Sequence, residues 1–191
     1  MGLDIHIVTD NYGEICSADY YDEKNDYFNK HSLSRTFCNL MCRQNVISHE
    51  PELQQIGKII NIDLSPLYEM ERYPEQESME FFLGNAESEE ERQSILDKAE
   101  ADKEKLKGNI DIVKQTIDNL IAKLNSIPNL PSLLIPTDFD TLNNQSYFSD
   151  FQLDKGKGYI DNNFGQDIRN FSRFLEYAKS KGTSTVWFNY G

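Results

Sequence analysis

Apolar residues recur in the second half of the chain at alternating gaps of three and four, which is the heptad spacing of an amphipathic helix. At the start of this run, Ser88 and Glu91 form a capping-box pattern, and at its end Pro128 disfavours helical angles in the preceding residue. We therefore predict a long helix over about 88–127. Its apolar stripe, residues 96–127, consists of Leu96, Ala99, Leu106, Ile110, Val113, Ile117, Leu120, Leu124 and Ile127.

The predicted helix is longer than a compact body of this size. A continuous rod over these residues would extend about 57 Å, whereas a compact chain of 191 residues is only about 40 Å across. The rod would protrude unless the chain folds back at Lys107-Gly108-Asn109, where glycine disfavours a helix. Because the heptad phase continues across Gly108 without a slip, we favour a continuous or gently bent helix over a hairpin.

Both ends of the chain carry strand patterns. Residues 3–7 alternate between apolar and polar, and residues 183–190 are rich in β-branched and aromatic side chains. An amphipathic helix over 168–178 precedes the second of these strands. We predict an α+β fold in which the two terminal strands share one small sheet, packed with several helices. The whole chain, 1–191, would form a single domain with 88–127 inserted as a helical arm or hairpin.

Shorter patterns lie between these elements. Turn residues at 10–13 and a second short strand over 14–17 predict an N-terminal β-hairpin. The polar, acidic and aromatic stretch 20–30 is typical of a loop. The remaining expectations are a helix over 32–45, a helix from Pro51 to about Gly57, a strand over 59–62, a helical turn from Ser65-Pro66, and no clear assignment over 73–85.

Charge and composition restrict the classes of function. The chain has 32 acidic against 19 basic residues, a net charge of −13. This balance argues against nucleic-acid binding and is compatible either with a basic protein partner or with plain solubility. We expect no membrane association, because no apolar run approaches the length of a membrane span and the start lacks the basic residues of a signal peptide. The three cysteines have no framework spacing, which favours a reducing cytoplasm.

Short motifs at the two ends resemble a group of proteins of unknown function. Met1-Gly2-Leu3-Asp4-Ile5 opens the chain, and Phe164-Gly165 precedes a helix and the aromatic strand Val186-Trp187-Phe188-Asn189-Tyr190. Leu33-Ser34-Arg35 opens an early helix. These features are similar to those of uncharacterised bacterial and phage proteins. The resemblance implies a prokaryotic, mobile-element context, and no activity is attached to the group.

Two candidate chemical sites lie near the termini. Asp4 and His6 project from the same side of the first strand, where a carboxylate can orient an imidazole for acid–base catalysis. Because no third partner is evident, a solvated outer strand face is the favoured interpretation. The cluster around the start of the last helix includes Asn163, Gln166 and Asp167, followed by Arg169 and Arg173. Free amides at this helix terminus could bind an anion or a carboxylate, and helix capping by Asn163 is the structural alternative.

Other motifs indicate no metal or cofactor. Asp138 and Asp140 resemble a cation-binding pair, but the further acidic ligands of a calcium loop are absent, so we read them as turn residues. Cys38 and Cys42, with His31 and His49 nearby, lack the tight knuckle of a structural zinc site, and packing of Cys38 is the simpler interpretation.

Our leading hypothesis is a non-enzymatic interaction protein of prokaryotic or phage type. It would act as an acidic inhibitor or immunity-type protein that binds a basic partner, or it would self-associate as a homodimer through the 96–127 stripe. The alternative is an enzyme or small-ligand-binding protein with a polar site near Asp4, His6 and the turn from Asn163 to Arg169. This alternative requires these residues to share one pocket.

Overall fold

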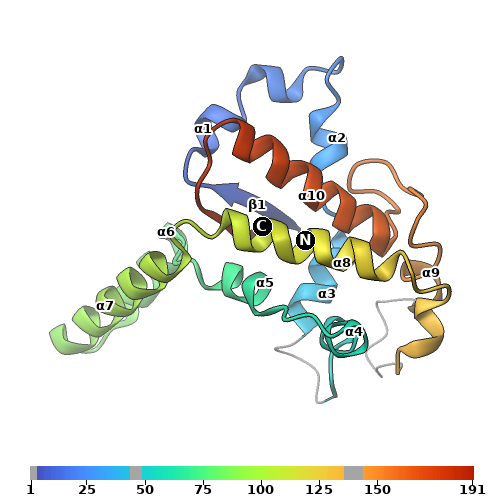
Figure 1. Cartoon of the computed structure of the whole chain (residues 1–191). Coiled ribbons are helices and arrows are strands. Elements are labelled where there is room, and N and C mark those ends of the chain that lie inside the picture. Colours follow the sequence, from blue (N-terminus) through green and yellow to red (C-terminus); the bar gives the residue numbers. More distant parts are fainter. Residues whose placement is uncertain (1–3, 44–48, 136–143) are drawn as a thin grey trace.

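A computed structural model of the protein describes residues 4–43, 49–135 and 144–191. Within these residues, helices surround one small sheet, and a helical arm projects to one side (Figure 1). In chain order the elements are β1 (Ile5–Thr9), α1 (Tyr12–Ile15), η1 (Ala18–Tyr21), α2 (Tyr27–His31), α3 (Arg35–Cys42), α4 (Glu52–Ile60), α5 (Ser65–Glu69), η3 (Met70–Arg72), α6 (Gln76–Asn85), α7 (Glu89–Leu106), α8 (Ile110–Leu124), η4 (Leu130–Leu133), α9 (Asn144–Tyr147), α10 (Phe164–Ser180) and β2 (Val186–Tyr190).

The sheet confirms the predicted meeting of the two chain ends. β1 and β2 pair antiparallel, with Ile5 opposite Tyr190 and Thr9 opposite Val186. Along β1 the alternation of apolar and polar residues places Ile5 and Ile7 in the core and leaves His6 exposed. With this sheet and the surrounding helices, the predicted α+β class is confirmed.

The core lies where α8 and α10 run side by side in front of the sheet (Figure 1). Both helices present apolar faces at helical spacing, so burial of these faces removes large side chains from water and stabilises the packing. The ring of Phe171 on α10 lies 5.6 Å from that of Phe188 on β2 and 6.3 Å from that of Phe37 on α3. These three aromatic side chains connect the last helix to the sheet and to α3.

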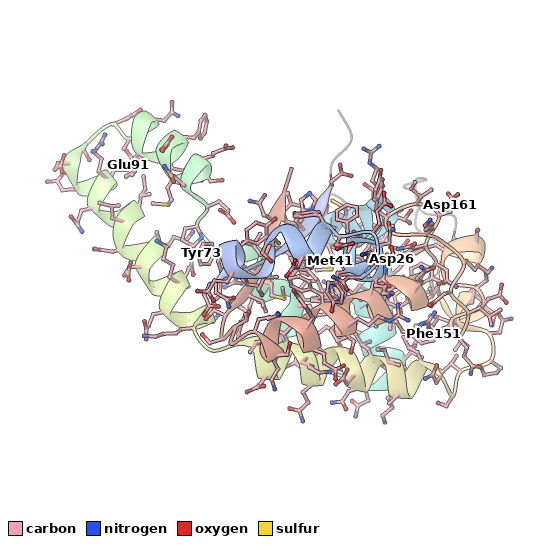
Figure 2. The ribbon with its side chains drawn as sticks, turned by 90° about the horizontal axis from the view of Figure 1, so that it is seen from above. Asp26, Met41, Tyr73, Glu91, Phe151 and Asp161 are labelled. Atoms are coloured by element: carbon pink, nitrogen blue, oxygen red, sulfur yellow. The ribbon has the colours of Figure 1, made fainter. Side chains whose placement is uncertain are left out.

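The expected continuous helix over 88–127 is corrected by the structure. Its start is as predicted, because the Ser88 hydroxyl accepts a hydrogen bond from the backbone N–H of Glu91 at 3.1 Å. The helix then ends at Leu106, and a new helix begins at Ile110. Between them Gly108 adopts φ of +74°, a left-handed conformation that glycine reaches without the penalty of a Cβ. The helix is therefore interrupted at Gly108, the glycine that the sequence indicated as unfavourable for a helix. However, α8 continues away from α7 and does not fold back on it (Figures 1 and 2).

Contacts with the strand β2 explain why the chain bends here. The side chain of Asn109 accepts a hydrogen bond from the backbone N–H of Val186 and donates one to its carbonyl, both at 2.8 Å. The backbone N–H of Gly108 donates to the hydroxyl of Thr185 at 3.0 Å. The connector thus pairs with the first residue of β2, and this tertiary pairing outweighs the local preference for a continuous helix.

Most of the apolar stripe over 96–127 packs against other parts of the same chain. Residues Leu106 to Leu124 of the stripe are buried, with exposed fractions between 0% and 4%. Toward the other end, Leu96 is 44% exposed. Within 106–124, therefore, the stripe presents no exposed apolar surface for a second copy of the helix.

Several short predicted elements are also corrected. Residues 14 and 15 of the predicted strand 14–17 lie at the end of α1, residues 16 and 17 follow it without strand structure, and the partner of β1 is β2. The turn residue Asp10 binds the segment before β2, accepting a hydrogen bond from the hydroxyl of Ser184 at 2.5 Å. The predicted loop 20–30 contains parts of η1 and α2. The first two residues of the predicted strand 59–62 are instead the end of α4, where Ile60 is buried at helical spacing from Leu53 and Ile56, and Asn61 caps the helix.

The helix predicted over 32–45 begins later, and its cap differs from the expected one. The side chain of Ser34, not that of Ser32, accepts the capping hydrogen bond from the backbone N–H of Phe37, and α3 extends from Arg35 to Cys42. The predicted end near Asn45 lies outside the described residues. The helical turn expected from Ser65-Pro66 is confirmed as α5.

Candidate functional site

Asp4 and His6, the predicted catalytic candidates, line one cavity beside β1. The Asp4 carboxylate pairs with the Arg35 guanidinium, with 2.7 Å between Oδ1 and Nε. The hydrogen bond from Arg35 holds the pKa of Asp4 below its usual value. Asp4 is therefore bound to Arg35 and not to the imidazole of His6. The two residues share a cavity, but the carboxylate does not orient the imidazole in the manner of a catalytic pair.

The predicted binding cluster at the start of α10 fastens the preceding loop to the helix. Asn163 caps α10, accepting from the backbone N–H of Gln166 at 2.8 Å, and its amide donates to three carbonyls of the loop at Ser149, Asp150 and Leu153. The Gln166 side chain both accepts from the N–H of Gly156 at 2.6 Å and donates to its carbonyl at 2.8 Å. Capping by Asn163 is thus present, and these amides bind backbone groups of the same chain.

The two arginines of the cluster make further contacts with the same loop. Arg169 donates to the carbonyls of Phe151 and Leu153, at 2.5 and 2.9 Å, and pairs with Asp154 at 2.6 Å. Arg173 pairs with the same carboxylate at 3.2 Å. Among the described residues that line the cavity at Asp4 and His6, none comes from this cluster. The predicted site residues therefore form two separate groups.

Asp167 is the centre of a buried polar network. Its carboxylate accepts four hydrogen bonds, from the backbone N–H and hydroxyl of Ser34 at 2.9 and 2.6 Å, from the amide of Asn162 at 2.8 Å and from the hydroxyl of Tyr147 at 2.8 Å. Burial raises the pKa of Asp167 to about 6, although the hydrogen bonds act in the opposite direction. With no exposed surface on Asp167, the network joins α3, α9 and α10 and is closed to a ligand.

Glycine allows the close approach that this network requires. A Cβ on Gly165 would overlap the carbonyl oxygen of Phe151 and approach the Arg169 guanidinium. Only glycine lets the first turn of α10 lie this close to the loop. The Phe164-Gly165 motif thus has a packing role that the sequence pattern alone did not reveal.

The arm formed by α6 and α7 is the main feature outside the core. It begins after Tyr73 at the edge of the body and reaches its outer end near Glu91 (Figure 2). The projecting element is therefore α6 with α7, and it both begins and ends earlier than the expected arm over 88–127. At its base, Leu106 is buried and Lys105 pairs with Glu69 at 2.6 Å.

The arm exposes an unusual amount of apolar surface for its size. Phe81 and Phe82 on α6 are 66% and 54% exposed, Leu96 on α7 is 44% exposed, and α6 contributes no buried residue. A groove of about 470 Å³ lies between the helices near the base, with an apolar lining that includes Met79, Phe82, Ile95 and Ala99. Residues 76–106 comprise ten acidic and four basic residues, a net charge of −6.

A second surface feature is the aromatic cavity that Asp4 and His6 border. It has a volume of about 360 Å³ and lies between β1, the layer of α1, η1 and α2, and the loop that precedes α10. Its aromatic side chains include Tyr12, Tyr20, Tyr21, Phe28 and Tyr159. Three of them, Tyr20, Tyr21 and Phe28, lie in the stretch 20–30 that was predicted as a loop, and the clustering of aromatic residues there was the available signal.

The thiols and acidic side chains form no metal centre in the part of the chain that is described. Cys38 is buried on α3, and Cys16, Cys38 and Cys42 are free thiols. Within 4–43, 49–135 and 144–191, no three His, Cys, Asp or Glu side chains are placed to bind one metal ion. Asp138 and Asp140, considered above as a cation-binding pair, lie outside these ranges.

Comparison with models of protein families, with curated protein sequences and with solved structures finds no match to this chain. Among the described helices, none combines the length and the apolar character needed to cross a lipid bilayer. The arm and the aromatic cavity are the two surface features that bear on function.

Proposed function

We propose that this protein is a non-enzymatic interaction protein that binds a basic protein partner through the α6–α7 arm. The observation that carries the proposal is the exposure of Phe81 and Phe82, at 66% and 54%, on an element with a net charge of −6. Apolar patches rimmed by charge are typical of protein-binding surfaces, and large exposed aromatic side chains commonly anchor such interfaces.

The geometry of the arm favours an amphipathic segment as the bound element. The groove between α6 and α7 offers an apolar floor at Phe82 and Ile95. Acidic side chains lie along both helices and concentrate at the turn between them, at Glu87, Glu89 and Glu90, all exposed. A partner helix with apolar residues on one face and Lys or Arg at its edges would match both properties.

A second copy of the chain is the alternative partner for the apolar surface of the arm. Two arms of equal negative charge repel each other at low ionic strength. The apolar stripe that suggested a homodimer is buried within the chain from Leu106 to Leu124. Charge complementarity therefore favours a basic partner over self-association, in keeping with an acidic inhibitor or immunity-type role.

The free thiols of Cys16, Cys38 and Cys42 fit our expectation of a reducing cytoplasm.

The enzyme alternative receives less support from the geometry. It required Asp4, His6 and the 163–169 turn to converge, and these residues form two separate groups. The side chains of Asn163 and Gln166 are occupied by loop carbonyls and by the backbone of Gly156. The small-ligand part of that alternative concerns the aromatic cavity alone.

The test is a titration of the isotopically labelled full chain with two designed helical peptides, followed by NMR. One peptide carries leucine on one face and lysine at its edges; the other replaces every lysine by glutamate. We expect the lysine peptide to shift resonances of residues 73–106, with binding that weakens as salt rises, and the glutamate peptide to have no effect. Equal binding of the two peptides, or shifts confined to the body, would overturn the proposal.

A further inference from the structure

The walls of the aromatic cavity form a continuous row of rings. The ring centroids of Tyr20 and Tyr21 are 5.3 Å apart, those of Tyr21 and Phe28 6.1 Å, and those of Phe28 and Tyr159 6.3 Å. Tyr21, Phe28 and Tyr159 are 56%, 40% and 47% exposed, so their faces and edges are open to a ligand. These residues come from η1, α2 and the loop before α10, which the fold brings to one place.

The deeper part of the cavity is uncharged. The ring of His31 is 7% exposed, and its Nδ1 lies 3.3 Å from the hydroxyl of Tyr20. Burial, with help from Arg173 and Lys30, lowers the pKa of His31 to about 4, so its imidazole is neutral at pH 7. Burial likewise raises the pKa of the Cys16 thiol, which keeps it protonated. The side chains that line this part of the cavity therefore carry no positive charge, and the charges of Arg173 and Lys30, which act on His31, come from residues outside the lining.

The surroundings of the cavity are acidic. Among its described lining residues there is no lysine or arginine, and Asp4, although paired with Arg35, lies at its border. An adjoining hollow shares three aromatic residues with the cavity, Tyr20, Tyr21 and Phe28. Its lining also includes three carboxylates, those of Asp22, Glu23 and Asp26, and one lysine, Lys157. Residues 10–28 contain six acidic residues and one basic residue, a net charge of −5. This field attracts cations and repels anions.

We propose that this cavity binds a small organic cation, an alkylated ammonium or a guanidinium group, held against the faces of Tyr21, Phe28 and Tyr159. Aromatic rings attract such cations through their electron-rich faces, and the attraction grows when the site excludes water. The cavity volume of about 360 Å³ is sufficient for a group of this size. The cavity shares no lining residue with the groove of the arm, so binding of a cation here does not depend on the arm's partner.

The test compares probes of equal shape and different charge. The full chain is titrated with choline and with 3,3-dimethylbutan-1-ol, its neutral carbon analogue, and the resonances of residues 4–35 and 157–160 are followed by NMR. We expect choline to bind about tenfold more tightly than the neutral alcohol. Equal affinities, or no saturable binding of choline, would overturn the proposal. Titration with N-acetylarginine amide identifies the source of the cation: tighter binding than choline indicates a peptide side chain, and weaker binding indicates a free ammonium compound.

Variants at the mouth of the cavity localise the effect. Tyr21→Leu and Tyr159→Leu alter exposed side chains and are expected to weaken choline binding about fivefold each, whereas Tyr21→Phe keeps the ring and the affinity. Phe81→Leu on the arm removes an equally exposed ring away from the cavity and should leave choline binding unchanged. If Tyr21→Leu and Phe81→Leu have the same effect on choline binding, the cavity is not the site.

Discussion

The ring of Tyr73 stacks on the ring of Trp187, with centroids 3.8 Å apart and planes inclined by 12°. Tyr73 lies immediately before the arm, and Trp187 lies in the strand β2. The indole N–H of Trp187 also donates a hydrogen bond to the carboxylate of Glu75 at 2.5 Å. These contacts fasten the first residues of the arm to the sheet, so the orientation of the arm depends on the two side chains.

Removing the Tyr73 ring should loosen the base of the arm. We expect Tyr73→Ala to cost about 1–2 kcal/mol through the lost stacking and burial. Trp187 is the only tryptophan of the chain, so its fluorescence reports on this contact directly, and its emission should move to longer wavelength as the ring becomes hydrated. Phe81→Ala, which removes an exposed ring elsewhere on the arm, is the control and should leave the emission unchanged. An unchanged spectrum for Tyr73→Ala would contradict the assignment of this contact.

The bend between α7 and α8 depends on the left-handed conformation of Gly108. A Cβ at this position would meet no atom within 4 Å, so the cost of Gly108→Ala comes from the backbone alone. We expect a loss of about 1–2 kcal/mol in the free energy of unfolding, measured by urea denaturation. Gly84→Ala is a matched control, because Gly84 lies inside α6 with equally open surroundings. It should be neutral or stabilising by up to about 1 kcal/mol. The same sign for both substitutions would argue against the bend.

Ser34 should matter more for stability than Tyr147, although both donate to Asp167. The Ser34 hydroxyl also accepts the capping hydrogen bond from Phe37 at 3.1 Å. We expect Ser34→Ala to cost about 2–3 kcal/mol and Tyr147→Phe about 1–1.5 kcal/mol. Ser180→Ala, at an exposed serine on α10, should change stability by less than about 0.5 kcal/mol. Equal effects of Ser34→Ala and Ser180→Ala on denaturant midpoints would show that the hydrogen bonds of Ser34 to Asp167 do not stabilise the fold.

The buried imidazole of His31 makes stability depend on pH. Its pKa falls from 6.5 to about 4 on folding, so the unfolded chain binds more protons between these values and stability is lost as pH falls through this window. Asp167 acts in the opposite sense, because its pKa rises from 3.8 to about 6 and its contribution grows as pH falls.

Comparison with His31→Phe separates the two effects. Phe retains the ring packing against Tyr27 and Phe174, and the variant still contains Asp167. Between pH 7 and 4.5 we expect the wild type to lose about 2 kcal/mol relative to this variant, as measured by urea denaturation at each pH. A stability difference that stays constant across this range would show that His31 is not buried in its neutral form.

Local patterns in the sequence predicted the elements whose stability is local or whose partners are the chain ends. The cap at Ser88, the last helix and the two terminal strands follow from side-chain periodicity and capping chemistry. The bend at Gly108 was not decided by these patterns. It depends on the pairing of Asn109 with Val186, which joins residues far apart in the chain.

The candidate sites were predicted only in part, for a similar reason. Asp4 and His6 were identified by their common face on the first strand, but the rings that complete the cavity come from a stretch with no periodicity. The cluster from Asn163 to Arg173 was correctly located on a helix terminus, whereas its carbonyl partners lie in an irregular loop. Side-chain to backbone contacts of this kind leave no periodic trace in a sequence.

The most direct test of the central claim is the affinity of the lysine-bearing helical peptide for the double variant Phe81→Ser/Phe82→Ser, with sedimentation of both proteins. Both phenylalanines are exposed and the substitutions preserve the charge of −6 on the arm, so only the apolar contact changes. We expect a monomeric wild type and a variant that binds the peptide at least about tenfold more weakly. Unchanged affinity, or a wild-type dimer that the double variant abolishes, would contradict the assignment of the arm to a basic partner.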